Sequence, residues 1–397
     1  MESASFNSLF ESVLTSIDEI CKKFDCGWQR RSRIIDTKLI LLFIFQTVTS
    51  KNSQGYSTTL NDVWNHFKGK GNRPRKDEPV APSSMCEARQ KLDENIFKEI
   101  NQKIVSEFES SVPKEDLLWN GLKLFAVDGS KINVPPELFD LGFNVTNKER
   151  RSAQGMASCL FHLKTRIPYD FSLDSHGNER IAAEAHLTYL NKDDCVIYDR
   201  GYFSYAMLLE HKKRGVHAVF RLSNLGVTKV IQAFIDDPNS PNDVTVTLNP
   251  TLDMLRDLVK RYSKDDLPPI RLRLIRYQIE DKIFFLATTL PDAFSIEIFP
   301  ELYHARWGVE EFYKIPKAFF QIEDFHAKSP RGVRQELFAG FVLTTLTRVF
   351  THQVEKSSLK TKNEASSVIK KNQKVPNQIR KMLQQHLSQF EQTSSTH

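Results

Sequence analysis

The 397-residue sequence lacks the cysteine pattern of a disulfide framework or of a structural zinc site. It has five cysteines, an odd number, and their spacing is scattered, with no Cys-x-x-Cys pair and no accompanying histidine cluster. Thiols used in this way suit a reducing compartment, so we expect a cytoplasmic protein.

No hydrophobic segment is long enough to cross a bilayer. The most apolar run, residues 39–45, is far shorter than the ~20 residues of a membrane-spanning helix. The first five residues also lack the basic stretch and apolar core of a signal peptide. We therefore expect no membrane association.

Neither sign of charge is in large excess. The formal net charge is +6, and the hydrophobic fraction of 40% is that of an ordinary soluble globular protein. Basic residues cluster at 30–33 and at 68–76, but such clusters are more often solvated surface than binding sites. By itself, the charge favours a nucleic-acid partner only weakly. The length allows two or three domains.

The N-terminal part of the chain has a helical pattern. Apolar side chains recur with a helical period from Phe6 to Ile17, and a basic loop rich in Gly and Pro follows near residues 69–82. Ser84, with Glu87 three residues later, predicts a capping box at the start of a further helix. We assign residues 1–115 to a helical, DNA-binding domain, although helical bundles that bind no DNA have the same pattern.

From residue 122 the apolar period changes to two, which predicts strands. Strands, a hairpin and intervening helices predict an α/β fold with a mixed sheet. This core spans residues 116–215 and 296–352, and a β-rich insertion at residues 216–295 interrupts it. The basic tail, residues 353–397, has a helical pattern and is a candidate for dimerisation.

Two aspartates occupy similar places in this pattern. Asp128 and Asp199 each follow a short apolar strand and precede a glycine by one or two residues. Carboxylates at the ends of neighbouring strands supply the oxygen ligands that Mg²⁺ prefers. Taken singly, each has an ordinary alternative: Asp128-Gly129 is a common hairpin turn, and Asp199 suits a loop or a helix N-cap.

A third carboxylate is predicted on a helix near residues 303–317. At about 100° per residue, one arc of this helix carries Tyr303, Arg306, Glu310 and Lys317. The opposite stripe is apolar and suited to burial, and it comprises Leu302, Ala305, Val309 and Phe312. A surface helix with an Arg306–Glu310 ion pair is the alternative. The neighbouring Glu311 lies about 100° off the arc, so Glu310 is preferred.

Together, these motifs resemble those of bacterial cut-and-paste DDE transposases of the insertion-sequence-four class. The Tyr-(2)-Arg-(3)-Glu-(6)-Lys signature of that family is matched by Tyr303, Arg306, Glu310 and Lys317. Its first acid lies in Val-Asp-Gly, as at residues 127–129, and its second in Asp-Arg-Gly-Tyr, as at residues 199–202. The likeness covers about residues 80–350.

The resemblance implies an RNase H-like core and a metal-dependent transposase that works as a homodimer in a synaptic complex. Its partners would be transposon-end DNA and target DNA, in a bacterial, nucleoid-associated location. Two Mg²⁺ ions, for which Mn²⁺ is expected to substitute, would support hydrolysis at the terminal inverted repeats and then strand transfer.

The resemblance also implies a role for each matching residue. The metal ligands and catalytic acids would be Asp128, Asp199 and Glu310. The residues that contact DNA would be Tyr303, Arg306, Lys317, Arg200 and Tyr202. Such phosphate contacts position DNA without specifying its sequence.

The sequence departs from the family pattern in two respects. Pro316 directly precedes Lys317, and an interior proline kinks a helix. The insertion has no Trp to hold a flipped base, and its other aromatics are better explained as strand core, so a DNA hairpin intermediate stays open. Two rival functions also stay open: a related nuclease without strand transfer, and a catalytically decayed regulator that binds terminal repeats.

Overall fold

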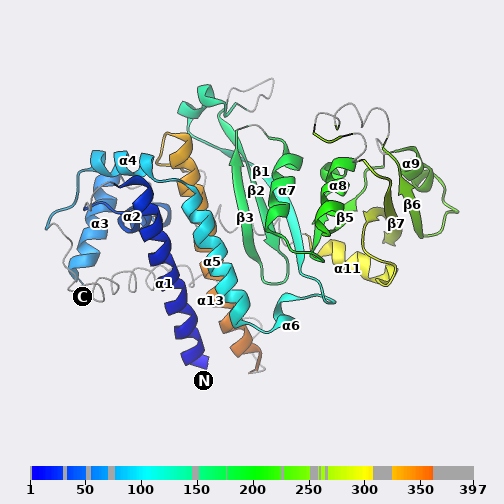
Figure 1. The fold of residues 1–397 in the computed structure, drawn as a ribbon, viewed down its shortest axis with the longest axis horizontal. Helices are drawn as coiled ribbons and strands as arrows, with labels where there is room; N and C mark the ends of the chain where they lie inside the picture. Colours follow the sequence, from blue (N-terminus) through cyan, green and yellow to red (C-terminus); the bar gives the residue numbers. More distant parts are fainter. Residues whose placement is uncertain are drawn as a thin grey trace.

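The computed structural model describes residues 2–29, 34–50, 55–69, 77–144, 152–175, 177–224, 228–250, 258, 261–263, 267–306 and 324–360. Figure 1 shows a group of long helices beside a sheet that carries helices on both faces. The described helices of the first group are α1 (Glu2–Trp28), α2 (Thr37–Thr49), α3 (Tyr56–Gly69), α4 (Pro82–Lys91), α5 (Asn95–Ser111) and α13 (Pro330–Lys360). A short helix, α6 (Lys114–Leu117), leads into the sheet.

The N-terminal region is helical, as its period predicts, but the predicted capping box is wrong. Helix α4 begins at Pro82 after Ala81, and no side chain caps it. Proline suits the first helical position because the N–H that it lacks would have no partner there. Ser84 therefore lies inside the helix.

One mixed sheet of eight strands runs through the rest of the molecule, which confirms the predicted α/β class. Its strand order is β3-β2-β1-β4-β5-β8-β7-β6. The strands are β1 (Leu124–Asn133), β2 (Gln154–His162), β3 (Ile167–Asp174), β4 (Cys195–Tyr198), β5 (His217–Arg221), β6 (Asp243–Leu248), β7 (Ile270–Ile279) and β8 (Lys282–Thr288).

Strand β1 is continuous through Asp128 and Gly129, so the hairpin turn considered for these residues does not occur. Asp128 pairs with Cys159 and Gly129 with Ser158, in an antiparallel ladder along the whole of β2. The local tendency of Asp-Gly to form a turn is overridden because β2 provides a backbone partner for each of these residues.

The β-rich segment extends the same sheet. Strand β8 pairs antiparallel with β5, and β7 and β6 follow it outwards. The strands expected near residues 218–222, 244–248, 270–279 and 282–288 all form, within one residue of the predicted ends. Glu280 makes the tight β7–β8 turn with a positive φ of 52°.

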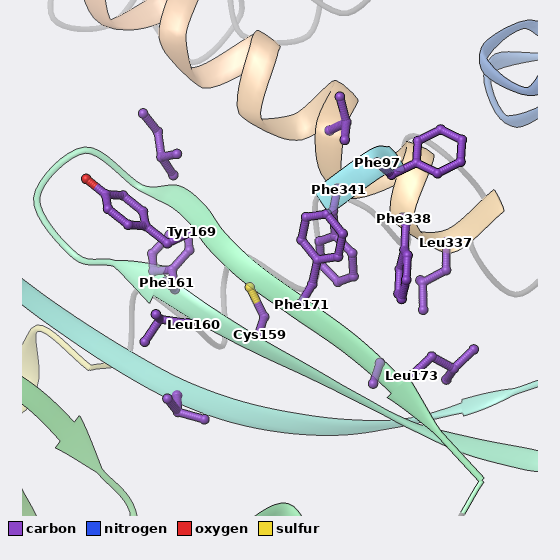
Figure 2. Packing of buried hydrophobic residues seen from close by; sticks show 14 of the residues in the cluster. Phe97, Cys159, Leu160, Phe161, Tyr169, Phe171, Leu173, Leu337, Phe338 and Phe341 are labelled. Atoms are coloured by element: carbon purple, nitrogen blue, oxygen red, sulfur yellow. The ribbon is translucent and has the colours of Figure 1, made fainter. Parts of the chain in front are cut away.

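The two faces of the β2–β3 hairpin bury different kinds of side chain. On one face, Phe171 stacks on Phe341 of α13 with ring centroids 4.8 Å apart (Figure 2). On the other, Ser158 and Asp170 lie against His186, the last residue of α7 (Glu179–His186). This alternation follows from the two-residue period of a strand.

Smaller helices complete the layers and position the strand ends. They are α8 (Tyr205–Arg214), α9 (Lys229–Asp236) and α11 (Phe299–His304), with 3₁₀ turns η1 (Pro136–Leu141), η2 (Leu187–Tyr189), η3 (Arg200–Tyr202) and η5 (Ile296–Ile298). Within the described part of the chain, no helix is both long and apolar enough to cross a membrane.

Candidate active site

The parallel pairing of β1 and β4 brings the two predicted aspartates to one level of the sheet. Leu124 pairs with Cys195 and Ala126 with Ile197. Two residues further along each strand, this register sets Asp128 beside Asp199. Neighbouring strands lie about 4.8 Å apart, so the two carboxylates emerge at one edge although 71 positions separate them in the sequence.

Asp199 is held by two residues of the predicted helical signature. The Tyr303 hydroxyl donates a hydrogen bond to its Oδ1 at 3.1 Å, and a guanidinium nitrogen of Arg306 lies 4.0 Å from Oδ2. The Asp199 side chain is 42% exposed, whereas that of Arg306 is only 5% exposed. The carboxylate therefore faces solvent on one side and its two partners on the other.

The hydroxyl of Tyr303 is kept neutral by its surroundings. Burial raises its pKa above the ordinary value, and this effect exceeds the opposing attraction of the Arg306 guanidinium. The charge of Asp199 raises the pKa further, because it disfavours a second negative charge nearby. Tyr303 is thus a hydrogen-bond donor at neutral pH.

A row of stacked cationic and aromatic groups runs from Tyr303 towards the β7–β8 turn. The Arg221 guanidinium lies 5.7 Å from the Tyr303 ring centre and 5.1 Å from that of Phe284. Phe284 in turn stacks on Tyr277, with ring centroids 5.2 Å apart and nearly parallel planes. The strand-core role expected for Tyr277 and Phe284 holds only in part, because both are half-buried.

Only the first residues of the predicted helix at 303–317 are described, and of these Tyr303 and His304 are helical, as the end of α11. Leu302 is buried as predicted, whereas Ala305, expected on the apolar stripe, is exposed. Helix α11 ends at His304 and Arg306 lies in the turn that follows, which rotates Ala305 off the stripe. Glu310 and Lys317 lie outside the described residues, as do residues 361–397 of the basic tail.

The Asp-Arg-Gly-Tyr motif divides between surface and core. Asp199 precedes the 3₁₀ turn η3, and Arg200 is exposed at its start. Tyr202, predicted to contact DNA, is buried and packs against Tyr198, with ring centroids 5.4 Å apart. Its environment is therefore that of a side chain beneath the site rather than on its surface.

Sequence analysis missed one carboxylate near these residues. Glu179 occupies the first turn of α7. The signal was present, because Asn178 caps the helix by accepting a hydrogen bond from the Arg180 N–H at 3.1 Å.

A Ser-His-Asp arrangement lies inside the fold but has no access to substrate. Ser158 Oγ is 3.0 Å from Nε2 of His186, whose Nδ1 is 2.7 Å from Asp170. All three side chains are buried. Burial alone raises the Asp170 pKa, yet the bond to His186 and the nearby Lys98 ammonium together lower it below the ordinary value. This network holds α7 on the sheet.

The predicted acids have the donor chemistry that a hard divalent cation requires. Asp128 and Asp199 supply carboxylate oxygens at one level of the sheet, and Mg²⁺ binds through one or two carboxylates while keeping several waters. Among the residues that the structure describes, no three Asp, Glu, His or Cys side chains are grouped so as to hold one ion. The predicted third ligand, Glu310, is outside that set.

Comparison with known proteins gives the family. The transposase DDE domain family matches residues 119–346, a span that includes both aspartates, Tyr303 and Arg306. The chain belongs to this family. It is a DDE transposase, as the sequence motifs indicate, and DDE domains generally use divalent metal ions to cut DNA.

Two further comparisons accompany the family match. A cryo-EM structure of a piggyBac transposase synaptic complex with hairpin DNA is similar, with a TM-score of 0.48 and 10% sequence identity. The alignment covers 100% of this chain and 82% of that one. No curated protein sequence matches significantly.

Proposed function

We propose that the protein excises and inserts a mobile DNA element by divalent-metal-dependent hydrolysis and strand transfer at terminal inverted repeats. It would belong to the insertion-sequence-four class and act as a homodimer on paired transposon ends. The observation that carries this proposal is the meeting of Asp128 and Asp199 at one sheet level, with Tyr303 and Arg306 in contact with Asp199.

The strand order supports an RNase H-like core. Strands β1, β2 and β3 form an antiparallel unit, and β4 and β5 add in parallel on the far side of β1. Under this proposal, β6 to β8 belong to the insertion predicted at residues 216–295, whereas β5, which lies in the same range, pairs with β4 and belongs to the core. Residues 1–115 form the DNA-binding domain, and the tail contributes to dimerisation. Arg200, exposed beside Asp199, is suited to contact DNA phosphate.

The chain's own residues suggest how the site would work. Asp128 and Asp199, with Glu310, would hold Mg²⁺ ions, which activate an attacking oxygen and stabilise the leaving one. Tyr303 fixes the orientation of Asp199 by donating to Oδ1, which leaves its solvent-facing side open to a ligand. Arg306 neutralises part of the carboxylate charge and would move to a phosphate when DNA binds. Lys317 is also proposed to contact phosphate.

The test uses DNA that flanks the coding region, with Mg²⁺, and maps the resulting strand ends. Asp128→Asn, Asp199→Asn and Glu310→Gln should each abolish cleavage, whereas binding to end DNA stays within a few-fold of the unsubstituted protein. The matched control Asp174→Asn, on an exposed carboxylate at the end of β3, should cut normally. Cleavage by any of the three variants at the unsubstituted rate would remove that residue from the site.

The same assay separates strand transfer from simple cutting. Products joined to target DNA are expected, and cut ends without joined products would identify the rival nuclease. Arg306→Ala should weaken DNA binding and make the slope of affinity against salt shallower, because one phosphate contact fewer releases fewer counterions. An unchanged slope would argue against a phosphate role for Arg306.

A further inference from the structure

A glutamate from a different element lies directly over the first acid motif. A Cβ placed on Gly129 would be 3.1 Å from Cγ of Glu179 and 3.3 Å from its carboxyl carbon. Gly129 follows Asp128 in β1, so the Glu179 side chain lies against the strand backbone next to Asp128, on the face of the sheet that α7 covers. A glycine at this position is what allows so close an approach.

Contacts at both ends of α7 fix the position of Glu179. At the first turn, Asn178 caps the helix, and Nε of Arg180 donates to the Gly201 carbonyl at 2.7 Å. That bond joins α7 to the turn that follows Asp199. At the last turn, His186 is held by buried Ser158 and Asp170.

Glu179 itself has no other evident partner. It forms no hydrogen bond or ion pair with a described residue. The favourable interaction of a carboxylate with the N-terminus of α7 is weak, and any helix start would provide it. That interaction does not explain why the carboxyl group lies over Gly129.

A buried hydroxyl lies in η3, the turn that packs against α7. Tyr202 is 2% exposed, and its hydroxyl has no hydrogen-bond partner among the described residues. Burial raises its pKa, and the charges of Glu179 and then Asp128 raise it further, so the hydroxyl lies within the field of both carboxylates. A buried hydroxyl without a hydrogen-bond partner is unfavourable, and a bound water would remove this cost.

We propose that Glu179 is a fourth carboxylate of the Asp128–Asp199 site and acts on its divalent ion through an ordered water that the Tyr202 hydroxyl also holds. This inference rests on the proposed function, because it requires the ion. A water-mediated role agrees with the absence, within the described ranges, of three side chains grouped for direct ligation. It also suits Mg²⁺, which keeps several waters when protein carboxylates bind it.

Metal binding without DNA tests this proposal. Thermal unfolding of the full chain is followed while MgCl₂ or MnCl₂ is added, and the titration gives the metal concentration above which the melting temperature begins to rise, which is set by the dissociation constant. Glu179→Gln should raise that concentration about 10–100-fold, as loss of an outer-shell ligand partner does. The concentration for Glu179→Asp should lie between those for Glu179→Gln and the unsubstituted protein. The control Glu87→Gln, which changes an exposed glutamate on α4, should match the unsubstituted protein.

A structural role for Glu179 predicts a different result. Removing a negative charge from among carboxylates should leave the metal-free melting temperature unchanged or raise it, whereas loss of a structural contact would lower it. A Glu179→Gln titration that coincides with that of the unsubstituted protein overturns the proposal, whatever its effect without metal.

Asp128→Asn separates this proposal from the function on which it rests. That variant should lose the metal-dependent rise almost completely. If it does and Glu179→Gln does not change the titration, the inference fails while the metal centre stands. If Asp128→Asn also titrates normally, both are wrong.

Discussion

The ion pair between Arg89 and Glu336 provides the sharpest test of how helix α4 is joined to helix α13. The two residues lie on α4 and α13, 247 positions apart, and each side chain is 3% exposed. Two guanidinium nitrogens of Arg89 lie 3.0 Å from Oε1 of Glu336. Its Nε donates to Gln335 at 3.1 Å, and its NH1 also donates to the Tyr56 hydroxyl.

Removing one partner should cost far more than removing both. Arg89→Met leaves the Glu336 charge buried beside the His326 backbone N–H, 2.8 Å from Oε2, and the His326 ring, whose Nδ1 lies 3.9 Å from the same oxygen, so we expect a loss of about 3–5 kcal/mol. The double variant Arg89→Met/Glu336→Leu removes both charges and should recover part of this loss, with a coupling energy of about 1–3 kcal/mol. Full recovery is not expected, because Gln335 and the Gly332 carbonyl each lose a donor.

The assay is urea unfolding followed by far-ultraviolet circular dichroism for the four proteins of the cycle. The matched control is Arg331→Met on α13, the helix that carries Glu336. The more exposed ion pair of Arg331 with Glu94 is worth less than about 1 kcal/mol. If Arg89→Met and Arg331→Met shift the midpoint equally, or if the double variant is as unstable as the sum of the two single ones, the reasoning from burial is refuted.

Three other outcomes follow from the same kind of reasoning. Tyr303→Phe removes the hydroxyl that donates a hydrogen bond to half-exposed Asp199. If this bond is worth about 1 kcal/mol, its loss should slow cleavage roughly fivefold and leave the DNA affinity unchanged. An unchanged cleavage rate would show that the bond has no role. Burial lowers the pKa of His211 to about 4, whereas the pKa in the unfolded chain is near 6.5. As the pH falls below 6.5, the unfolded chain therefore binds one proton more than the folded protein, and the stability decreases. His211→Gln should remove about 2–3 kcal/mol of the stability difference between about pH 7 and 4, and an equally steep acid loss in the variant would contradict this assignment. Gly332→Ala would put a Cβ 2.6 Å from that of Ala327 and should destabilise the start of α13 by about 1–3 kcal/mol, so a melting temperature equal to that of the unsubstituted protein would rule out the clash.

Local patterns predicted those parts of the fold that depend on near neighbours. The strands β2 and β8 were correctly assigned because each contains a short apolar run bounded by turn residues, a pattern typical of strands that are buried on both faces over much of their length. The family followed from short motifs around Asp128 and Asp199. Errors arose where a local signal competed with a distant partner, as at Asp128-Gly129, where pairing with β2 prevails over the turn.

What the sequence by itself determined, therefore, is the succession of helices and strands and the residue types at the strand ends. Only the tertiary structure decided that β8 joins β5, that Tyr303 turns inward onto Asp199, and that Glu179 covers Gly129. A helical or strand period depends on contacts a few residues apart, which the sequence displays directly. Contacts between distant segments depend on how whole elements pack, and no short pattern encodes that choice.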